Sequence, residues 1–444
     1  MSYIPNTDAD LKQMLEDIGA GDFEKLVANI PASLRYRHDL NIPKALSEHE
    51  LLRHITGMSE KNQKYDCCFA GGGAYDHFIP SVIGNLAFRS EFITAYTPYQ
   101  AEVSQGTLQA MYEFQSMISA LTGMAVTNAS MYDGASALAE AGLLATRHTG
   151  RNEILVAGTV NPNYIETIKT YLGGLEIKIT TVPFIDGLVD YKSLRDKLSD
   201  KIAAFIIQSP NFLGMIENIE EIALDVKNSG ALLIMAYDPI SLGVLKTPGE
   251  YGVDIACADG QPLGLPLSFG GPYVGLFSVT QELIRKMPGR LTAKTKDING
   301  KTGYVLTLQT REQHIRREKA TSNICSNQQL CAFMASIYLA VMGKAGIKRA
   351  AELCLTKAHY AAQRICELPG YKLKFNAPFF KEFVVQTPVT PHKIIDTLNR
   401  YNILAGVDLG GFKLGLKGCL MVAVTEKISY EQIDELVFRL SKVK

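Results

Sequence analysis

Short apolar runs alternate with amphipathic stretches between residues 154 and 237, and this alternation limits the fold more than any other feature of the chain. Apolar runs of strand length lie at 154–157, 177–179, 203–207 and 231–237, with helical patterns at 165–172, 194–198 and 219–226 between them. Such alternation is typical of βαβ units, whose parallel strands are buried on both faces. Two more strand-sized runs follow, at 254–258 and 273–279. We therefore predict an α/β fold with a mainly parallel sheet.

Helical patterns dominate on either side of this region. Apolar residues recur at helical spacing from Leu108 to Leu121, and Gly123 stands where a glycine would end the helix. Ser47 followed by Glu50 predicts a capping box at the start of an earlier helix. After residue 320 the pattern predicts helices at 327–342 and 347–368, and then strands alternating with helices up to residue 440. We predict three parts: a helical and loop-rich segment 1–90, a large α/β domain 91–320, and C-terminal helices with a smaller α+β domain 321–444.

Composition excludes several classes of partner. The 444 residues include 45 basic and 45 acidic side chains, so the chain has no electrostatic signature for nucleic acid or for an anionic membrane. We find no apolar stretch of roughly 18 residues and no signal-peptide pattern at the N-terminus, and we expect a cytoplasmic protein without membrane contact. The eight cysteines form no Cys-x-x-Cys pair and no histidine stands at metal-ligand spacing. We expect reduced thiols and no metal site.

An acidic residue follows one predicted strand, and the basic residue that should accompany it is missing. Asp238 comes directly after the run 231–237, at the carboxyl edge of the sheet, where ligands usually bind, although a solvated aspartate is also common there. In α/β enzymes that use pyridoxal phosphate (PLP), such an acid faces the pyridine nitrogen and a lysine shortly downstream forms the Schiff base. No lysine, arginine or histidine stands between Lys246 and Arg285. The chain therefore has the acid of a PLP site without its lysine.

The start of the alanine-rich helix after residue 133 is a second candidate part of a cofactor site. Backbone amides of Gly134, Ala135 and Ser136 at a helix N-terminus would suit a phosphate. Asp133 precedes them as a predicted N-cap, and its carboxylate would repel a phosphate. This second argument favours a capped, tightly packed helix start over a phosphate site.

A polar loop before the helix at 108–121 concentrates hydrogen-bonding groups. It carries Tyr96, Tyr99, Gln100, Glu102 and Gln105. Such a loop suits a ligand cleft or a subunit interface, where tyrosine is enriched. An exposed loop without a role remains an alternative.

Five segments of the chain carry a resemblance to a known family. The residues at 72–80, 96–109, 128–141, 268–273 and 316–325 are similar to the P-protein of the glycine cleavage system, and in particular to its subunit 1, the α chain of the split bacterial form. The likeness covers nearly the whole chain, and its motifs are long and rich in uncommon combinations. It implies the aminotransferase-like fold of PLP-dependent transferases (fold type I), in which active sites form between two subunits.

The resemblance also implies that the cofactor is held elsewhere. In the β partner a lysine binds PLP, and aligning the glycine-rich run 270–275 places Gln261 at the position of that lysine. An amide cannot form an imine. The partner's phosphate loop reads Gly-Ala-His, whereas this chain has Gly134, Ala135 and Ser136. These three residues and Asp238 are then relics of a cofactor site, and PLP is expected on the β partner and not covalently on this chain.

The activity implied by the resemblance is that of glycine dehydrogenase (aminomethyl-transferring). Together with the β subunit, the chain would decarboxylate glycine and pass the aminomethyl group to the lipoyl arm of the H-protein. The expected assembly is a heterotetramer of two α and two β chains. This chain would complete the partner's active site, and the candidate residues are Tyr96, Tyr99, Gln100, Glu102 and Gln105.

Three other interpretations are open at this point. In the first, the chain is an autonomous PLP enzyme that uses another lysine, such as Lys246 or Lys294. In the second, it is a non-catalytic regulatory or scaffolding protein that kept the fold. In the third, it is a decarboxylase subunit for a different amino acid. A lysine elsewhere is the weakest of them, because the Schiff base must meet the ring opposite the phosphate.

Overall fold

The computed structural model describes residues 5–36, 38, 40–94, 96–325 and 327–443. The chain divides into two compact units, Met1–Gln63 and Lys64–Lys444. The predicted boundaries near residues 90 and 320, which lie inside the second unit, stay a prediction.

The first unit consists of helices that form no core of their own. It contains α1 (Asp8–Asp17), α2 (Phe23–Leu26) and α3 (Glu48–Ser59). The side chain of Ser47 accepts from the backbone of Glu50 and the Glu50 carboxylate accepts from the backbone of Ser47, so the predicted capping box is confirmed. Among the described residues of this unit only Leu15 is buried. Local capping, and not burial, therefore defines these helices.

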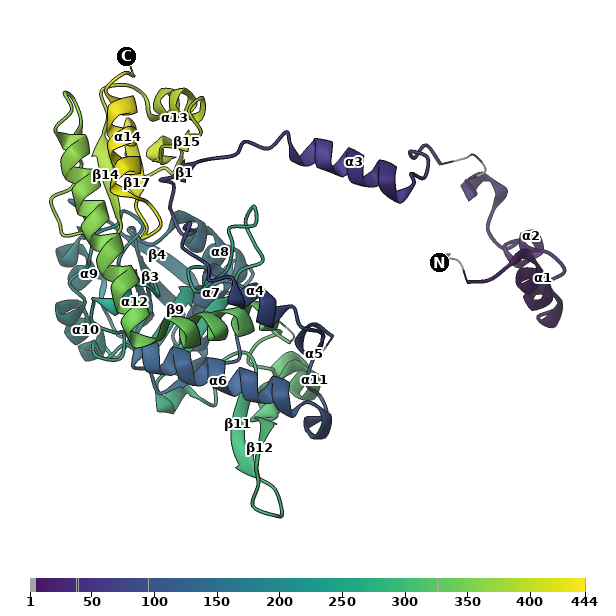
Figure 1. Ribbon diagram of the computed structural model, residues 1–444. Coiled ribbons are helices and arrows are strands. Elements are labelled where there is room, and N and C mark those ends of the chain that lie inside the picture. Colours follow the sequence, from purple (N-terminus) through teal and green to yellow (C-terminus); the bar gives the residue numbers. More distant parts are fainter. Residues whose placement is uncertain (1–4, 37, 39, 95, 326, 444) are drawn as a thin grey trace. The chain divides into compact units, whose positions relative to one another are not determined.

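A mainly parallel sheet organises the second unit, as predicted (Figure 1). Its strands in the described residues are β2 (Val126–Thr127), β3 (Glu153–Ala157), β4 (Lys178–Val182), β7 (Ile202–Gln208), β8 (Leu232–Ala236), β9 (Ile255–Asp259) and β10 (Gly275–Val279). They lie in the order β2-β10-β9-β8-β7-β3-β4, and only β10 runs antiparallel to its neighbours. The residues of β3, β7, β8 and β9 are almost all buried, whereas the edge strand β4 is partly exposed. This burial on both faces agrees with the continuous apolar sequences of these strands.

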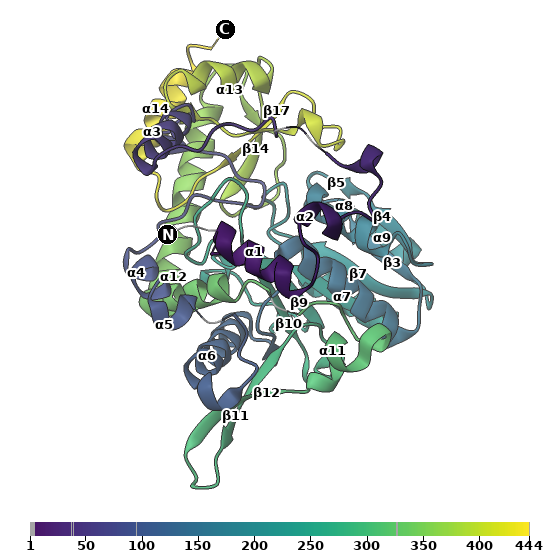
Figure 2. The same cartoon turned by 90° about the vertical axis from the view of Figure 1, so that its right-hand side faces the viewer.

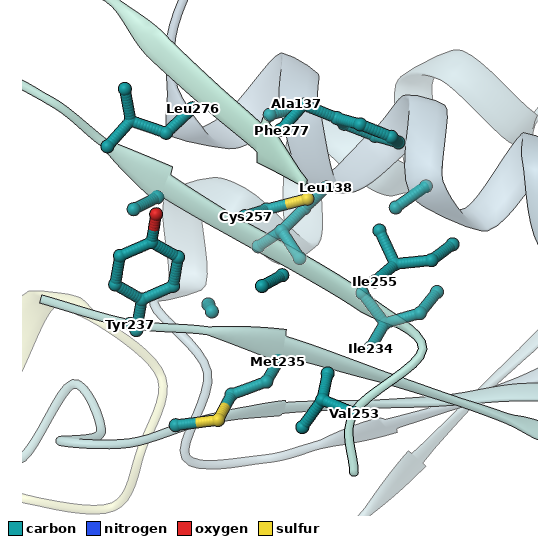
Figure 3. Packing of buried hydrophobic residues seen from close by; sticks show 14 of the residues in the cluster. Ala137, Leu138, Ile234, Met235, Tyr237, Val253, Ile255, Cys257, Leu276 and Phe277 are labelled. Atoms are coloured by element: carbon teal, nitrogen blue, oxygen red, sulfur yellow. The ribbon is translucent and has the colours of Figure 1, made fainter. Parts of the chain in front are cut away.

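Helices cover the sheet and are anchored by apolar contacts. The connecting helices are α6 (Gln105–Thr122), α7 (Gly134–Thr149), α8 (Pro162–Leu172), α9 (Tyr191–Lys197) and α10 (Ile219–Asn228). Figure 3 shows side chains of β8, β9 and β10 packing with Ala137 and Leu138 of α7. Gly123 ends α6 with a left-handed φ of 69°, as expected for a glycine at this position.

The long helix α12 (Gln329–Cys366) connects the large sheet with the C-terminal part. Gly343, with φ 58° and ψ −175°, interrupts it, so α12 consists of two helical segments that meet at a kink, and the two predicted helices are confirmed. In the described chain it is the one helix long and apolar enough to be considered as a membrane span. Its first half packs in the core of the large sheet and its second half in the C-terminal core, so it is a core helix.

The C-terminal part is a smaller α+β layer, as expected. Strands β13 (Lys372–Leu373), β14 (Glu382–Gln386), β17 (Cys419–Ala423) and β16 (Val407–Asp408) pair antiparallel in that order, and α13 (Pro391–Asn399) and α14 (Tyr430–Leu440) accompany them (Figure 1). The early strand β1 (Cys67–Cys68) pairs in parallel with β15 (Ile403–Leu404). Residues just after the N-terminal unit are thereby tied to the C-terminal part, and this pairing brings the following turn toward the large sheet.

Shorter elements complete the fold. They are α4 (Val82–Ala87), α5 (Ser90–Ile93), α11 (Gln313–Arg316), the strand pair β5 (Phe184–Ile185) and β6 (Leu188–Val189), and the hairpin β11 (Leu291–Lys296) and β12 (Thr302–Thr307). The hairpin extends beside α6 in both views (Figures 1 and 2).

Candidate functional site

The candidate site lies where the carboxyl ends of β8 and β9 meet the N-terminus of α7. Asp238 is the second residue after β8, Asp259 is the last residue of β9, and Gly134 is the first residue of α7. Consecutive parallel strands end at the same edge of the sheet, which is why residues far apart in sequence converge here. The convergence of Asp238 with the helix start is the one expected of a PLP site.

Asp238 is already paired with a lysine of the small domain. Its Oδ2 lies 2.5 Å from Nζ of Lys381, and the two side chains are 11% and 2% exposed. Its Oδ1 accepts from the backbone of Ile240 at 2.8 Å. Lys381 immediately precedes β14, so the ion pair joins the large sheet to the small one. Both oxygens of this carboxylate therefore have partners within the chain.

His77 and Tyr75 enclose the Lys381 ammonium. Nζ lies 2.9 Å from Nε2 of His77 and 3.5 Å from the centre of the Tyr75 ring. Because an ammonium only donates, Nε2 must accept, and Nδ1–H of His77 therefore donates to Oε2 of Glu426 at 2.6 Å. Burial, followed by the nearby Lys381 charge, lowers the pKa of His77, which keeps this imidazole neutral. Burial opposes ionisation of Glu426, but its hydrogen bonds, first with His77, lower its pKa to about 2.

Glu426 also brings a thiol close to the imidazole. The ligand atoms of His77, Cys354 and Glu426 lie within 4.8 Å of one another, with Cys354 Sγ 3.4 Å from the carboxylate. The carboxylate already accepts from the imidazole, and the Lys381 cation touches the far side of the same ring. These side chains form a hydrogen-bonded chain that ends in the Lys381 cation. That cation disfavours a metal ion, which would bring a second positive charge.

Glu382 fixes the glycine-rich turn that carries Tyr75. Its two oxygens accept from the backbone of Gly72 and from the hydroxyl of Tyr75, both at 2.7 Å. A Cβ on Gly71 would lie 2.1 Å from Oε1 of Glu382, so only glycine permits this approach. Complete burial raises the pKa of Glu382 to about 7.

Gln261, at the position expected for the lysine, is a structural residue in this chain. Its Oε1 accepts from the backbone N–H of Tyr75 at 2.9 Å, and its Nε2 donates to the carbonyls of Tyr75 and Leu265 at 2.9 and 2.8 Å. The side chain is 1% exposed. The side-chain amide of Gln261 thus both accepts from and donates to the backbone of Tyr75. An amide nitrogen cannot form an imine with a cofactor aldehyde.

Carboxylates cap the helix start that would otherwise receive a phosphate. Asp133 accepts from the backbone of Ser136 at 2.7 Å, which confirms it as the N-cap, and Asp259 accepts from the backbone of Gly134 at 3.2 Å. A Cβ on Gly134 would lie 2.7 Å from both the Asp259 nitrogen and the Tyr164 hydroxyl. Ser136 is buried and Ala135 is half-buried. The amides of Gly134 and Ser136 therefore already donate to carboxyl groups of the chain, as the Asp133 argument from sequence suggested.

The residues present do not fit PLP. The space left at the edge of the sheet, lined by Asp238, Asp259, Lys381 and neighbouring side chains, is about 30 Å³. Small-molecule sites usually measure roughly 300–1,000 Å³. The ring partner, the Schiff-base position and the phosphate seat are each occupied by groups of the chain itself. Asp238, Gln261, Gly134 and Ser136 thus have partners within the chain.

The polar loop lies outside this filled site. Tyr96 and Tyr99 are 78% and 67% exposed, and Gln100 and Glu102 are also exposed. None of these four lines the 30 Å³ space as the structure describes it. Tyr96 instead stands at a separate cavity of about 200 Å³ between α5, α6 and α12.

Gln105 differs from the other loop residues, because its side-chain amide is hydrogen-bonded to the backbone of this chain. It donates to the carbonyls of Ala101 and Tyr304 at 2.7 and 2.9 Å and accepts from the backbone of Tyr304 at 2.8 Å. The residue holds the β11–β12 hairpin to the start of α6.

The other lysines considered from sequence lie away from the filled site. Lys246 pairs with Glu220 on the surface, and Lys294 is exposed on β11. Neither lines the space at Asp238 in the described structure. The alternative of an autonomous PLP enzyme using one of these lysines gains no support.

Sequence reasoning missed the residues that fill the site: Lys381, Glu382, His77 and Glu426. One available signal was the adjacent Lys381 and Glu382 at the start of an otherwise apolar strand, since charges beside a buried strand need partners. The other was the turn Gly71–His77, whose consecutive glycines indicate close approach of backbone and side chains.

Comparisons with known structures first define the class. The fold matches a Burkholderia pseudomallei sphingosine-1-phosphate lyase at a TM-score of 0.66 and 13% identity, and a NifS-like protein at 0.64 and 11%. These likenesses show the fold of PLP-dependent enzymes of fold type I, which confirms the predicted fold class. A crystal structure of a glycine decarboxylase (P-protein) of the glycine cleavage system matches at a TM-score of 0.93 and 39% identity over 100% of both chains.

Sequence comparisons then define the family. The family model of the glycine cleavage system P-protein matches residues 1–440. Proteins described as probable glycine dehydrogenase (decarboxylating) subunit 1 are 52% identical in Chloroherpeton thalassium and 49% identical in Desulforamulus reducens, each over 100% of both chains. The chain belongs to the glycine cleavage system P-protein family.

Removal of the buried ammonium tests the Lys381–Asp238 pair. Lys381→Met leaves Asp238 buried without a cation, and we expect the free energy of unfolding to fall by about 3–5 kcal/mol. Urea unfolding followed by circular dichroism measures this change. The double variant Lys381→Met/Asp238→Asn should recover most of the loss. A loss in the double variant equal to the sum of the losses in Lys381→Met and Asp238→Asn alone would show that the two side chains are not coupled.

The pH dependence of stability tests the burial of Glu382. Its folded pKa of about 7 lies above the usual 4.5, so its contribution to stability is complete below pH 4.5 and is lost as the pH rises through 7. We expect Glu382→Gln to flatten the fall in melting temperature between these pH values, by the equivalent of at most about 3 kcal/mol. Asp259, with a pKa raised to about 7 by burial, contributes in the same direction and is left intact in this variant. An unchanged slope would contradict the assignment.

Proposed function

We propose that this chain is the subunit of a glycine decarboxylase that carries no cofactor and completes the active site of a partner that does. The single observation that carries the proposal is the closed network at the sheet edge, in which Lys381 pairs with Asp238 and Gln261, at the position expected for a lysine, donates to backbone carbonyls. The chain keeps the fold of the family without room for PLP, so the family's chemistry needs a second polypeptide. The description "subunit 1" for relatives of equal length supports this division.

The reaction we propose for the assembly is glycine decarboxylation with transfer of the aminomethyl group. Relatives are described as decarboxylating glycine dehydrogenases, and the matched crystal structure is described as a glycine decarboxylase of the glycine cleavage system. PLP on the partner would supply the electron sink for loss of carbon dioxide. The acceptor would be the lipoyl arm of the H-protein, and the assembly two copies of each chain in the cytoplasm.

The loop from Tyr96 to Glu102 is the part of this chain that we propose to reach the partner's site. Its polar tips are exposed on short or rigid stems, so little conformational entropy is lost when they are fixed. Gln105 and Tyr304 anchor the end of the loop through three hydrogen bonds that involve no exposed group. In the proposed role Tyr96, Tyr99, Gln100 and Glu102 present hydrogen bonds, and Gln105 positions the loop.

Reconstitution tests the proposed division of labour. We expect exchange between glycine and labelled bicarbonate only when this chain, the PLP-bearing partner and lipoylated H-protein are present together. PLP content, measured on the separated chains, should lie in the partner. Full exchange by the partner and H-protein without this chain would contradict the proposal and would favour a regulatory or scaffolding role.

Two conservative substitutions test the loop. Tyr96→Phe and Glu102→Gln each remove one hydrogen-bonding function, and we expect turnover of the complex to fall roughly tenfold, as for loss of one good hydrogen bond. PLP content and size of the assembly should stay unchanged. Tyr171→Phe on α8 is a matched control that should leave turnover unaltered. Loss of PLP from the partner in the loop variants would instead indicate a structural role.

A further inference from the structure

A cavity separate from the filled cofactor position remains open at the large domain. It measures about 200 Å³ and lies between α5, the middle of α6 and the start of α12. Phe92 and Phe333 pack at 4.2 Å between ring centres on one side, and Met111 and Phe114 of α6 form another wall. The exposed residues Tyr96 and Ile93 also line the cavity. An engineered apolar cavity of about 150 Å³ is large enough to bind benzene, so this space admits a small organic molecule.

One charged side chain faces this largely apolar space. Arg290 lines the cavity and is only 4% exposed. Its Nε lies 3.4 Å from Oε2 of Glu312 and its Nη2 lies 3.3 Å from Sγ of Cys325. The described residues supply no hydrogen-bond acceptor for Nη1, and this atom is not among the fully enclosed polar atoms without a partner. Arg290 lines the cavity, and Nη1 is the donor of its guanidinium that has no acceptor among the described residues.

The charges around Arg290 leave a positive surplus. Arg311 is also buried and donates only to backbone carbonyls, among them those of Leu308 and Gly289 at 3.1 and 3.0 Å. Glu312 is the one carboxylate that the described chain pairs with Arg290, and it is shared weakly with His314 at 3.6 Å. Two buried guanidinium groups thus stand against a single carboxylate. Burying a second cation without a carboxylate of its own costs free energy, and an anion at Nη1 would offset this desolvation cost.

We propose that this cavity binds a small aliphatic carboxylate, with the carboxylate on Nη1 of Arg290 and the chain against the apolar wall of α6 and α12. A guanidinium recognises a carboxylate through short, charge-assisted hydrogen bonds. The aromatic and aliphatic walls select for an apolar tail. An anion without a tail leaves these walls unfilled, and a tail without a charge leaves Nη1 unpaired, so the site discriminates in favour of molecules that carry both. The ligand contacts Tyr96, which links the site to the polar loop.

Titration calorimetry of the full chain with octanoate tests the proposal, and octanamide and acetate serve as matched probes. We expect saturable binding of one octanoate per chain. Octanamide keeps the tail and loses the charge, and acetate keeps the charge and loses the tail. Each should bind at least about tenfold more weakly. Absence of octanoate binding, or equal affinity for octanamide, would overturn the proposal.

Two variants locate the binding. Arg290→Lys keeps the charge but removes the fork that presents Nη1, and Ala110→Leu fills the cavity from α6 with a good helix former. Both should weaken octanoate binding about tenfold or more, and Ala110→Leu keeps the test valid if Arg290→Lys disturbs folding. Unchanged affinity in Ala110→Leu would place octanoate elsewhere and refute the site. The measurement uses this chain alone, so its outcome is independent of the decarboxylase proposal.

Discussion

The ion pair between Lys381 and Asp238 is the interaction on which the rest of the functional site depends. It lies in a buried environment, where separating the charges is costly, and it joins an element of the small sheet to the carboxyl edge of the large one. Around it, His77 accepts from Lys381, Glu426 orients His77, and Tyr75 covers the ammonium. Glu382 and Gln261 hold the turn that carries Tyr75 and His77. The network closes the place where a cofactor would lie and fixes the two sheets against each other.

This closure is the basis of the proposal that a fold shared with PLP enzymes serves here as a subunit that carries no cofactor. The fold type I architecture still brings Asp238 and the start of α7 to one edge, because that convergence follows from the strand order. The groups that reach this edge now satisfy one another. We propose that the chain's contribution to catalysis comes from the exposed loop from Tyr96 to Glu102 and not from the closed network at Asp238.

The sequence predicted the parts of the fold that depend on local pattern. Apolar runs and amphipathic stretches predicted the parallel sheet, and Gly123 predicted the end of α6. The Ser47 capping box predicted the start of α3, and Asp133 as N-cap predicted the start of α7. The absence of a lysine near Gln261 also led to the expectation that the chain holds no covalent cofactor, and this stays a prediction. The partner of Asp238 was not predictable in this way, because Lys381 stands 143 positions away and its approach depends on how the two sheets pack. The hydrogen bonds of Gln105 to Tyr304 were likewise not predictable. A glutamine in a polar loop can face solvent or bind a distant hairpin, and the local sequence does not distinguish the two.

The most direct test of the central claim is the binding of PLP to the purified chain, measured by absorbance of the imine and, after borohydride reduction, by mass spectrometry of the peptides. Because Lys381 is engaged with Asp238 and Gln261 has no amine, the account predicts no saturable absorbance change and no stoichiometric adduct on any one lysine. A single lysine carrying one equivalent of reduced cofactor, at Lys381 or elsewhere, would contradict it.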